Sequence, residues 1–461
     1  MLMVFAMVNA SGQQSAVWEL PGISSDTSIV RYYKPQQYII YSRHGNDPAT
    51  VSYVDALNGT AQTVPLPPGV TINDFCILGT KVIAGGAYLQ GTQKFGLLSL
   101  FSITELMAGT VTFHSCRFMP TSMVDGLCSI NYLDLIVGVK QIVVIDESLP
   151  AIAFIADNHI MDNNTNVVLF KRSGYGSAYV SGSADWVMRP YHYNKYGVEY
   201  YTDIDTTSGN IVLSALSTDS LTLRLQVFNR TLDYAGNSTP PYIYLTNRYC
   251  HNDHTLASKP MLTALEGDTF AVAYHTKAVN DNGYLAVKKY SINATVPSLE
   301  ESMVLSMSGV NDNNTLMIRD MRYNRRLHRL MILNDSPHPM VAAFGSYVHI
   351  IDMWNMSVGA HTLAHPPLHF SEYSLDIYED DGFILSGREI SSGQLMTYFE
   401  MLHMPFSCGQ RYDLTKYKRT NPLMHVISRH HCTIVPVCQN VLYAETPVPN
   451  TVTNTCLRNN P

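Results

Sequence analysis

The sequence is poor in charged residues, and it is poorest in basic ones. Asp, Glu, Lys and Arg make up 15% of its 461 residues, whereas about a quarter is usual. The formal net charge is −7, and the densest basic stretches, 319–329 and 416–419, are short. A nucleic-acid-binding protein needs a concentrated basic surface. We therefore expect no nucleic-acid partner.

Long hydrophobic runs and helical periodicity are also scarce. No apolar run beyond the first residues approaches the roughly 18 that a membrane-spanning helix needs, so we expect no membrane span. The best helix candidates, Ser102–Met107 and Leu299–Met307, are short and weak. Tyr outnumbers Phe by 29 to 15, which is typical of strands with one solvated face. The sequence therefore predicts an all-β protein.

Catalytic motifs are missing too. The chain has no G-x-S-x-G elbow, phosphate-binding glycine loop or H-E-x-x-H pair. Weak metal candidates are His251, Asp253 and His254, but no second ligand cluster lies at a diagnostic distance. Asp203 and Asp205 do not match the spacing of a calcium loop. We therefore expect no metal and no cofactor, and catalytic residues stay unknown.

A further histidine group is spaced four residues apart, at His361, His365 and His369. That spacing would align the three side chains on one face of a helix. Pro366 and Pro367 are incompatible with such a helix. We expect a loop at this place instead.

The N-terminal residues are typical of an export signal. The apolar run Leu2–Val8 precedes small residues at Ala10 and Gly12, which predicts a signal peptide over 1–12 that is cleaved before Gln13. The expected basic segment is missing, since the first Lys or Arg is Arg31, so the true start is expected upstream of Met1. The alternative is a buried N-terminal strand. Export places the protein outside the cell or on its surface.

Cysteines and glycosylation sequons agree with export. The eight cysteines are an even number, which is typical of disulfides in an oxidising compartment; the candidates are Cys76, Cys116, Cys128, Cys250, Cys408, Cys432, Cys438 and Cys456. Asn-x-Ser/Thr sequons make glycosylation candidates of Asn58, Asn163, Asn229, Asn237, Asn293, Asn313 and Asn355. In a bacterial protein these sequons would be Asn-rich turns without glycans.

Strand-like runs with two turns per unit recur along the chain. In the clearest unit, Asn73–Leu78 turns at Gly79-Thr80 into Lys81–Gly86, and a second turn leads to Phe95–Phe101. Two other clear units run over Leu262–Tyr290 and Tyr373–Met401, and weaker copies turn near Lys34-Pro35, Leu133-Asp134, Ser208-Gly209 and Arg325-Arg326. Such a repeat is typical of small sheets in a radial array, where each buries its faces against its neighbours.

The first turns at 34, 79, 133, 208, 267, 325 and 381 predict seven blades, and six or eight stay open. The longest interval, 75 residues, holds Val167–Phe170, Ala178–Ser181 and Trp186–Met188, enough for an insertion or an eighth blade. A strand around Ala16–Leu20 could complete the last blade and close the ring. Stacked β-sandwiches are the architectural alternative, but a sandwich domain spans about a hundred residues, which is longer than the intervals between these turns.

The segment Ile72–Leu78, with Val82–Gly86 and Gly96–Phe101, resembles a blade of a generic β-propeller repeat. The match is good over 71–103, partial over 371–403 and loose elsewhere. The resemblance implies a propeller and no named family. The WD dipeptide, the repeated kelch glycine pair and the sialidase Ser-x-Asp-x-Gly box are all missing from the sequence.

The repeat stops near Pro405. We therefore divide the chain into a signal peptide (1–12), a propeller (13–404) and a cysteine-rich tail (405–461). The tail is too small to bury a sufficient core alone, and we predict that its four cysteines pair among themselves. The alternative is a zinc site formed by these cysteines with His425, His430 or His431.

These observations favour a non-enzymatic binding or interaction module outside the cell, with propeller loops that recognise a glycan or a protein. One alternative is a polysaccharide hydrolase or lyase with its site at the channel mouth, and another is a self-assembling structural subunit. An enzyme should show acidic, basic and aromatic side chains that converge in one funnel. A binding module should show a shallow polar or aromatic face without perturbed acids.

Overall fold

A computed structural model describes the strand-forming core of the chain. The described residues are 15–25, 27–56, 58–118, 136–146, 151–158, 165–171, 186–189, 199–217, 222–229, 242–246, 254–256, 260–278, 284–293, 296–306, 317–335, 347–354, 356, 361–365, 370–378, 382–389, 394–401, 410–413 and 425–429.

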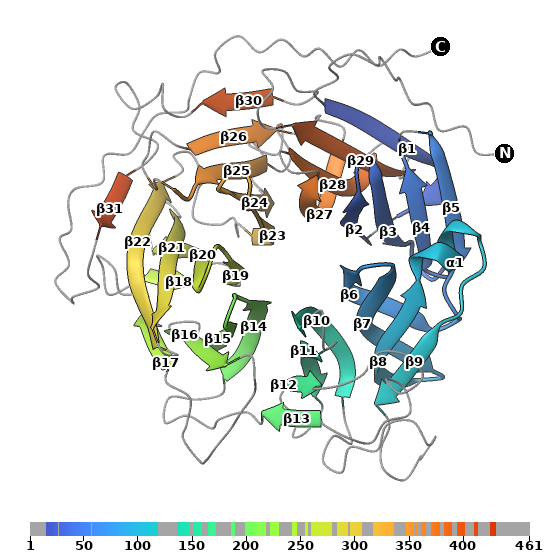
Figure 1. Ribbon diagram of the computed structural model, residues 1–461, viewed down its shortest axis with the longest axis horizontal. Coiled ribbons are helices and arrows are strands. Elements are labelled where there is room, and N and C mark those ends of the chain that lie inside the picture. Colours follow the sequence, from blue (N-terminus) through green and yellow to red (C-terminus); the bar gives the residue numbers. More distant parts are fainter. Residues whose placement is uncertain are drawn as a thin grey trace.

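Within these ranges the strands form seven antiparallel sheets, which stand side by side around a central axis (Figure 1). Consecutive strands pair in order within most sheets, with the first strand nearest the axis. This is the arrangement of a β-propeller, so that part of the prediction is confirmed. We number the sheets 1 to 7 by the position of their innermost strand in the chain.

The first four sheets use the chain up to residue 246. Sheet 1 comprises β2 (Thr27–Lys34), β3 (Gln37–Arg43), β4 (Thr50–Asp55) and β5 (Thr60–Pro65). Sheet 2 comprises β6 (Val70–Leu78), β7 (Lys81–Gln90), β8 (Gln93–Ser102) and β9 (His114–Phe118). Sheet 3 comprises β10 (Ile136–Asp146), β11 (Ala151–Asn158), β12 (Thr165–Lys171) and β13 (Trp186–Arg189). Sheet 4 comprises β14 (Glu199–Thr206), β15 (Asn210–Ser217), β16 (Thr222–Asn229) and β17 (Tyr242–Thr246).

The last three sheets combine strands from distant parts of the chain. Sheet 5 comprises β18 (His254–Leu256), β19 (Met261–Ala264), β20 (Thr269–Ala278), β21 (Tyr284–Asn293), β22 (Val296–Ser306) and β31 (His425–Arg429). Sheet 6 comprises β23 (Met317–Asn324), β24 (Arg329–Asp335), β25 (Tyr347–Asp352), β26 (His361–His365) and β30 (Gln410–Asp413). Sheet 7 comprises β27 (Phe370–Tyr378), β28 (Gly382–Glu389), β29 (Gln394–Met401) and β1 (Ser15–Ser24).

The N-terminal strand closes the ring. β1 is the outermost strand of sheet 7 and pairs antiparallel with β29, so that Ser15 lies opposite Glu400 and Glu19 opposite Met396. The expected closing strand around Ala16–Leu20 is therefore confirmed. The residues of the expected signal peptide, 1–12, lie outside the described residues.

Two strands of the C-terminal segment extend sheets of the ring. β30 pairs with β26 at the outer edge of sheet 6, and β31 pairs with β22 at the outer edge of sheet 5 (Figure 1). Their backbone groups satisfy strand edges that would otherwise face solvent. The four tail cysteines lie outside the described residues, so their pairing stays a prediction.

Sheet 3 differs from the expected turn positions. Its first connection joins Asp146 to Ala151, whereas the expected turn at Leu133-Asp134 lies outside the described residues. The runs expected to form an insertion or an eighth blade belong in part to this sheet, since Val167–Phe170 lies in β12 and Trp186–Met188 in β13. The run at 178–181 lies outside the described residues.

Two local expectations were wrong. Leu299–Met307 is not helical: the described part lies in β22, where pairing with β21 outweighs the weak helical pattern. His361–His365 is the strand β26 rather than a loop. The helix expected at Ser102–Met107 is present as α1 (Ile103–Met107), which begins where the Ser102 hydroxyl accepts the Thr104 backbone N–H. No helix in the described residues has the length and hydrophobicity that crossing a bilayer requires.

The hydrophobic core lies between neighbouring sheets. Between sheets 1 and 2, for example, Tyr41 and Val51 pack in one cluster with Phe75, Val82 and Phe101. Comparable clusters join sheets 4 and 5, 5 and 6, 6 and 7, and 7 and 1. Each fully buried aliphatic or aromatic side chain contributes about 1.5–3 kcal/mol. Because these clusters pack sheets 1, 5, 6 and 7 on both sides, they hold the innermost strands of these sheets at fixed positions around the axis.

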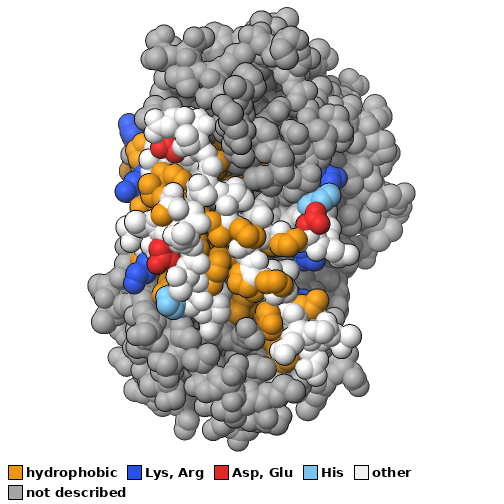
Figure 2. Space-filling view, turned by 90° about the vertical axis from the view of Figure 1, so that its right-hand side faces the viewer, with side chains coloured by type: hydrophobic (Ala, Val, Ile, Leu, Met, Phe, Trp, Pro, Cys, Tyr) orange, Lys and Arg blue, Asp and Glu red, His pale blue; other side chains and the backbone are white. Residues whose placement is uncertain are grey.

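The side of the molecule that carries α1 exposes hydrophobic side chains. In Figure 2 hydrophobic side chains gather toward the middle of the described surface, and charged side chains lie mainly toward its margins. Met107 on α1 and Leu89 at the end of β7 are about half exposed, at 49% and 52%.

Candidate functional site

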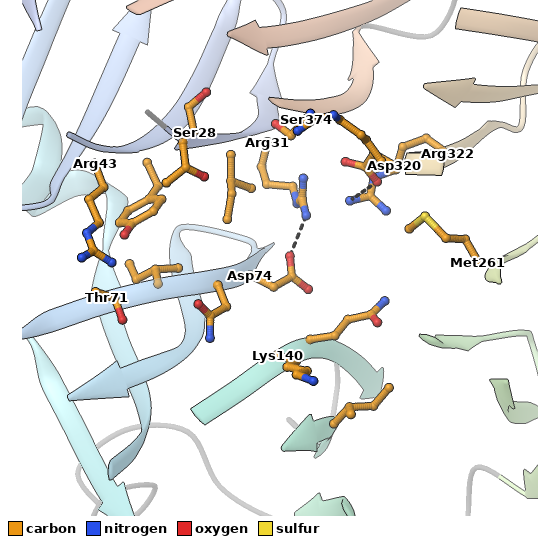
Figure 3. Close-up of a pocket in the computed structure, with 18 of the residues that line it drawn as sticks. Ser28, Arg31, Arg43, Thr71, Asp74, Lys140, Met261, Asp320, Arg322 and Ser374 are labelled. Carbon is orange, nitrogen blue, oxygen red and sulfur yellow. Dashed lines mark hydrogen bonds and ion pairs between the residues drawn. The ribbon is translucent and has the colours of Figure 1, made fainter. Parts of the chain in front are cut away.

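A cavity of about 360 Å³ lies at the axis of the ring, close to the end where β2 and β19 begin (Figure 3). Its wall includes a side chain from the innermost strand of every sheet: Arg31, Asp74, Gln141, Thr202, Met261, Arg322 and Ser374. The volume falls at the small end of the range for ligand pockets, roughly 300–1,000 Å³. The cavity is the candidate site because all sheets of the ring contribute to it.

Asp74 on β6 joins three sheets at this cavity. One carboxylate oxygen accepts the backbone N–H of Phe75 at 2.9 Å, and the other accepts the N–H of Ile142 on β10 at 3.1 Å. The guanidinium of Arg31 on β2 donates to the same carboxylate at 2.6 Å (Figure 3). The carboxylate therefore holds the innermost strands of sheets 1, 2 and 3 together.

The same contact recurs farther round the ring. Asp320 on β23 accepts the N–H of Met321 at 2.9 Å and that of Leu375 on β27 at 3.1 Å. Asp203 on β14 accepts the N–H of Ile204 at 2.9 Å and that of Leu262 on β19 at 2.6 Å. In each case an Asp inside an innermost strand accepts the N–H of the next residue in its own strand and an N–H of the following sheet. We call Asp74, Asp203 and Asp320 the bridging aspartates.

Two further carboxylates extend this network. Asp205 accepts the backbone N–H of Ala264 at 2.7 Å, and Asp376 accepts that of Tyr32 at 2.7 Å, which links sheet 7 to sheet 1. Burial raises the pKa of Asp205 and of Asp376, although these hydrogen bonds lower it. Their side chains serve as acceptors for backbone amides, which explains why they lie inside the ring.

Arg322 connects two of these carboxylates. Its guanidinium lies 3.2 Å from Asp320 (Figure 3) and 3.5 Å from Asp376. Burial alone would lower its pKa, but Asp320 and Asp376 raise the pKa above the usual value. The arginine therefore stays charged and ties sheet 6 to sheet 7.

β-Bulges direct a second set of side chains toward the cavity. In five innermost strands the pairing register shifts by one extra residue at an equivalent place; these residues are Asn73, Lys140, Thr202, Arg319 and Tyr373. β10 has two further shifts, and β2 has one between Tyr32 and Lys34. A bulge re-aims the side chain of its extra residue. Asn73, Lys140, Thr202 and Arg319 all line the cavity. The bulges thus turn the side chains at equivalent positions on sheets 2, 3, 4 and 6 toward the cavity.

The cavity wall carries charges of both signs. Five of its side chains are basic, Arg31, Arg43, Lys140, Arg319 and Arg322, and two are carboxylates, Asp74 and Asp320. Arg31 and Arg322 pair with the two carboxylates, Asp74 and Asp320. Arg43, Lys140 and Arg319 are exposed to solvent.

The weak metal candidates contribute nothing to this cavity. His251 and Asp253 lie outside the described residues, and of His254 only its backbone place at the start of β18 is described. The described residues contain no group of three His, Cys, Asp or Glu side chains that could hold a metal ion. Asp203 and Asp205 lie in β14 and accept backbone N–H groups of β19.

Cys76 is the disulfide candidate whose side chain lies within the described residues. It carries a free thiol there, and its sulfur lies 3.8 Å from the carbonyl oxygen of Ile83 on the paired strand β7. It lies inside β6, where its cross-strand neighbour is Ile83, and the disulfide framework stays a prediction. Burial raises the pKa of this thiol. Cys116 lies in β9, but its side chain and the remaining cysteines are outside the described residues.

Glycosylation candidates are described in part. Asn58 is exposed in the turn between β4 and β5, and its amide nitrogen donates to Asp55 at 2.8 Å. Asn229 and Asn293 end the strands β16 and β21. Asn163, Asn237, Asn313 and Asn355 lie outside the described residues.

Comparison with known proteins bears on the fold. No family model and no curated protein sequence matches the chain. The polysaccharide lyase Uly1 is 9% identical at a TM-score of 0.50, over 83% of this chain and 90% of that one. The β-propeller domain of Myceliophteria thermophila Cps50 (Swd1) is 11% identical at 0.47, over 83% and 98%. That of Vanderwaltozyma polyspora Nup133 is 8% identical at 0.42, over 86% and 99%. These similarities concern the fold alone.

Proposed function

We propose that the chain is an exported, non-enzymatic binding module whose ligand enters the axial cavity. One observation carries this proposal. The bridging aspartates accept backbone N–H groups of neighbouring sheets, so they serve the ring rather than a substrate. The groups that face solvent are exposed basic and neutral polar side chains.

Convergence of charged side chains is also what an enzyme should show, so the polysaccharide hydrolase or lyase stays the second candidate. Arg31, Asp74, Asp320 and Arg322 meet in one cavity, and burial raises the pKa of Asp205 and Asp376 nearby. The contacts favour binding, because a general acid or base needs a carboxyl group that can reach the substrate. Asp205 and Asp376 instead accept backbone amides.

We also propose that the ring has seven blades. Each of the seven sheets in the described ranges supplies an innermost strand to the cavity wall. An experimental structure of the whole chain tests this count. An additional sheet formed by the residues between β9 and β10 or between β13 and β14 would make the count wrong.

The binding proposal is tested with a variant that fills the cavity entrance. Thr27 lines the cavity and is exposed at the start of β2, and Thr110 is exposed just after α1, away from the cavity wall. We expect the secreted protein to bind members of a glycan array or peptide library. Thr27→Trp should weaken that binding at least roughly tenfold, the cost of steric exclusion from a small pocket. Thr110→Trp is the matched control.

Two outcomes contradict the proposal. Depolymerisation of a polysaccharide by the wild-type chain, measured as released reducing or unsaturated ends, favours the enzyme. Ligand binding that Thr27→Trp leaves unchanged places the binding site elsewhere on the molecule.

A third candidate, self-assembly through the outer side shown in Figure 2, predicts a concentration-dependent mass in sedimentation.

A further inference from the structure

We propose that Trp354 is the stacking platform of a second binding site, which takes one ring of a neutral saccharide. Trp354 is 76% exposed, more than any other large hydrophobic side chain in the described residues. It follows β25, which ends at Asp352 beside the turn 325–328 between β23 and β24. β23 begins beside the axial cavity and ends at this turn, so Trp354 lies at the opposite end of the ring. The site therefore goes beyond the proposed function, which concerns the cavity.

The backbone that carries Trp354 is fixed. Its N–H donates to the Asp352 carboxylate at 2.9 Å, and the N–H of Met353 donates to the carbonyl oxygen of His328 at 2.8 Å. Met353 and Met356, on either side of Trp354 in the chain, are buried in the core cluster between sheets 5 and 6 (Figure 1). The indole thus projects into solvent from an anchored segment, which lowers the entropy cost of ordering it around a ligand.

His328 supports the indole although its own backbone is strained. It has a φ of 52°, whereas in the first turns of sheets 2 and 5 the residue with positive φ is glycine, Gly79 or Gly267. Glycine adopts this conformation without strain, and other residues do so at a cost. The imidazole has its ring centre 5.1 Å from that of Trp354, and its Nδ1 lies 2.8 Å from Glu266 Oε1. A strained residue whose side chain makes such contacts is typical of ligand clamps and other functional sites.

Polar side chains beside the indole suit sugar hydroxyls. Besides the pair of Glu266 with His328, Arg329 Nη1 lies 3.1 Å from Asp352 Oδ2. These four side chains are between 24% and 47% exposed, so a ligand can reach their remaining N–H groups and lone pairs. A pyranose ring with equatorial hydroxyls presents C–H bonds on its faces and hydroxyls at its edge. The C–H bonds fit the negative face of the Trp354 indole, and the hydroxyls fit the polar side chains around it.

The same surroundings argue against two other ligands. A stable protein interface has an apolar core, but in the described part of the chain the apolar neighbours Met353 and Met356 are buried. An organic cation can also stack on an indole, but the acidic groups here are accompanied by arginines: Arg329 in an ion pair, and Arg325 exposed in the adjoining turn. A neutral saccharide satisfies both the aromatic face and the mixed polar groups.

The test is isothermal titration calorimetry of the full chain with three neutral β-linked probes, cellotetraose, xylotetraose and chitotetraose, and with choline chloride. Asn355 begins a sequon next to Trp354, so every protein carries Asn355→Gln and no attached glycan competes with the probe. We expect at least one tetrasaccharide to bind with a Kd of about 1 mM or below, as one stacked ring allows. Choline should bind at least roughly tenfold more weakly, because it lacks the hydroxyl edge of a sugar ring.

Three variants locate the binding. Trp354→Ala should weaken tetrasaccharide binding by at least roughly tenfold, as truncation of a central Trp does. His328→Gly relieves the positive φ while it removes the imidazole, so it should leave Tm within about 2 °C of the wild type yet weaken binding several-fold. Leu89→Ala, which truncates another exposed apolar side chain, is the matched control and should bind like the wild type. Circular dichroism confirms that each variant is folded.

The outcomes separate this inference from the proposed function. The absence of binding by every tetrasaccharide overturns the inference, and so does binding that Trp354→Ala leaves unchanged. Choline that binds as tightly as the best tetrasaccharide assigns the indole to cations and also overturns it. Full affinity in His328→Gly contradicts the positioning role of the imidazole. Thr27→Trp should not affect this binding; binding that Thr27→Trp abolishes and Trp354→Ala preserves supports the cavity and refutes the second site.

Discussion

Replacement of Asp203 by alanine tests whether the bridging aspartates hold the ring. The side chain is 1% exposed, and it accepts the N–H of Ile204 at 2.9 Å, the N–H of Leu262 at 2.6 Å and the amide of Gln141. Asp203→Ala leaves two buried backbone donors without this acceptor, whereas the half-buried Gln141 amide keeps the carbonyl oxygen of Ile204 as an acceptor. Each buried donor costs about 1–3 kcal/mol, so we expect a loss of about 2–6 kcal/mol. That is a large part of the roughly 5–15 kcal/mol that stabilises a typical protein.

The assay is thermal unfolding followed by circular dichroism. With an unfolding entropy of about 2.1 cal/mol/K per residue and about 390 residues in the ring, the expected loss lowers Tm by about 2–7 °C. Asp203→Asn keeps one acceptor oxygen and should lower Tm by about half as much. Asp47→Ala, at an exposed turn residue, is the control. A change in Tm below about 1 °C for Asp203→Ala would refute the role assigned to the bridging aspartates.

Three other predictions concern the same chain. Gly86→Ala should lower Tm by several degrees, because its Cβ would overlap the Thr71 carbonyl on β6, and Tm equal to wild type would contradict this packing. Asp268→Asn should flatten the pH dependence of stability near pH 4 and below. Burial would raise the pKa of Asp268, but hydrogen bonds from Thr207 and others lower it. The carboxylate therefore stabilises the fold above the unfolded-state pKa of about 3.9, and this stabilisation is lost as the pH falls through the folded-state pKa. Mass spectrometry of non-reduced peptides should find the four tail cysteines paired with one another, and free thiols or a retained metal there would count against it.

Most of the strands could be predicted because the signals for them are local. The turns at Gly79 and Gly267 have positive φ, which glycine adopts without strain, and the strands beside them follow from their apolar residues. Sheet 3 was harder, because its first connection, 147–150, contains no glycine. The strand β22 was missed at Leu299–Met307 because its conformation depends on pairing with β21, which no local pattern reports.

The axial site was not predicted, although part of its signal is in the sequence. An Asp followed by an apolar residue recurs at Asp74-Phe75, Asp203-Ile204 and Asp320-Met321, and this recurrence could have identified the bridging aspartates. The cations could not be found in the same way. Lys140 and Arg319 face the cavity because a bulge shifts the register, and a bulge is defined only by the partner strand.

The way in which β1 completes sheet 7 has a mechanical consequence. Because Ser15 lies opposite Glu400 and Glu19 lies opposite Met396, the leading end of β1 lies beside the trailing end of β29. A force that pulls these two ends outward loads the cross-strand hydrogen bonds one pair at a time, beginning at Ser15, and does not shear them together. The joint that closes the ring therefore opens by unzipping, at a lower force than any strand pair pulled along its length.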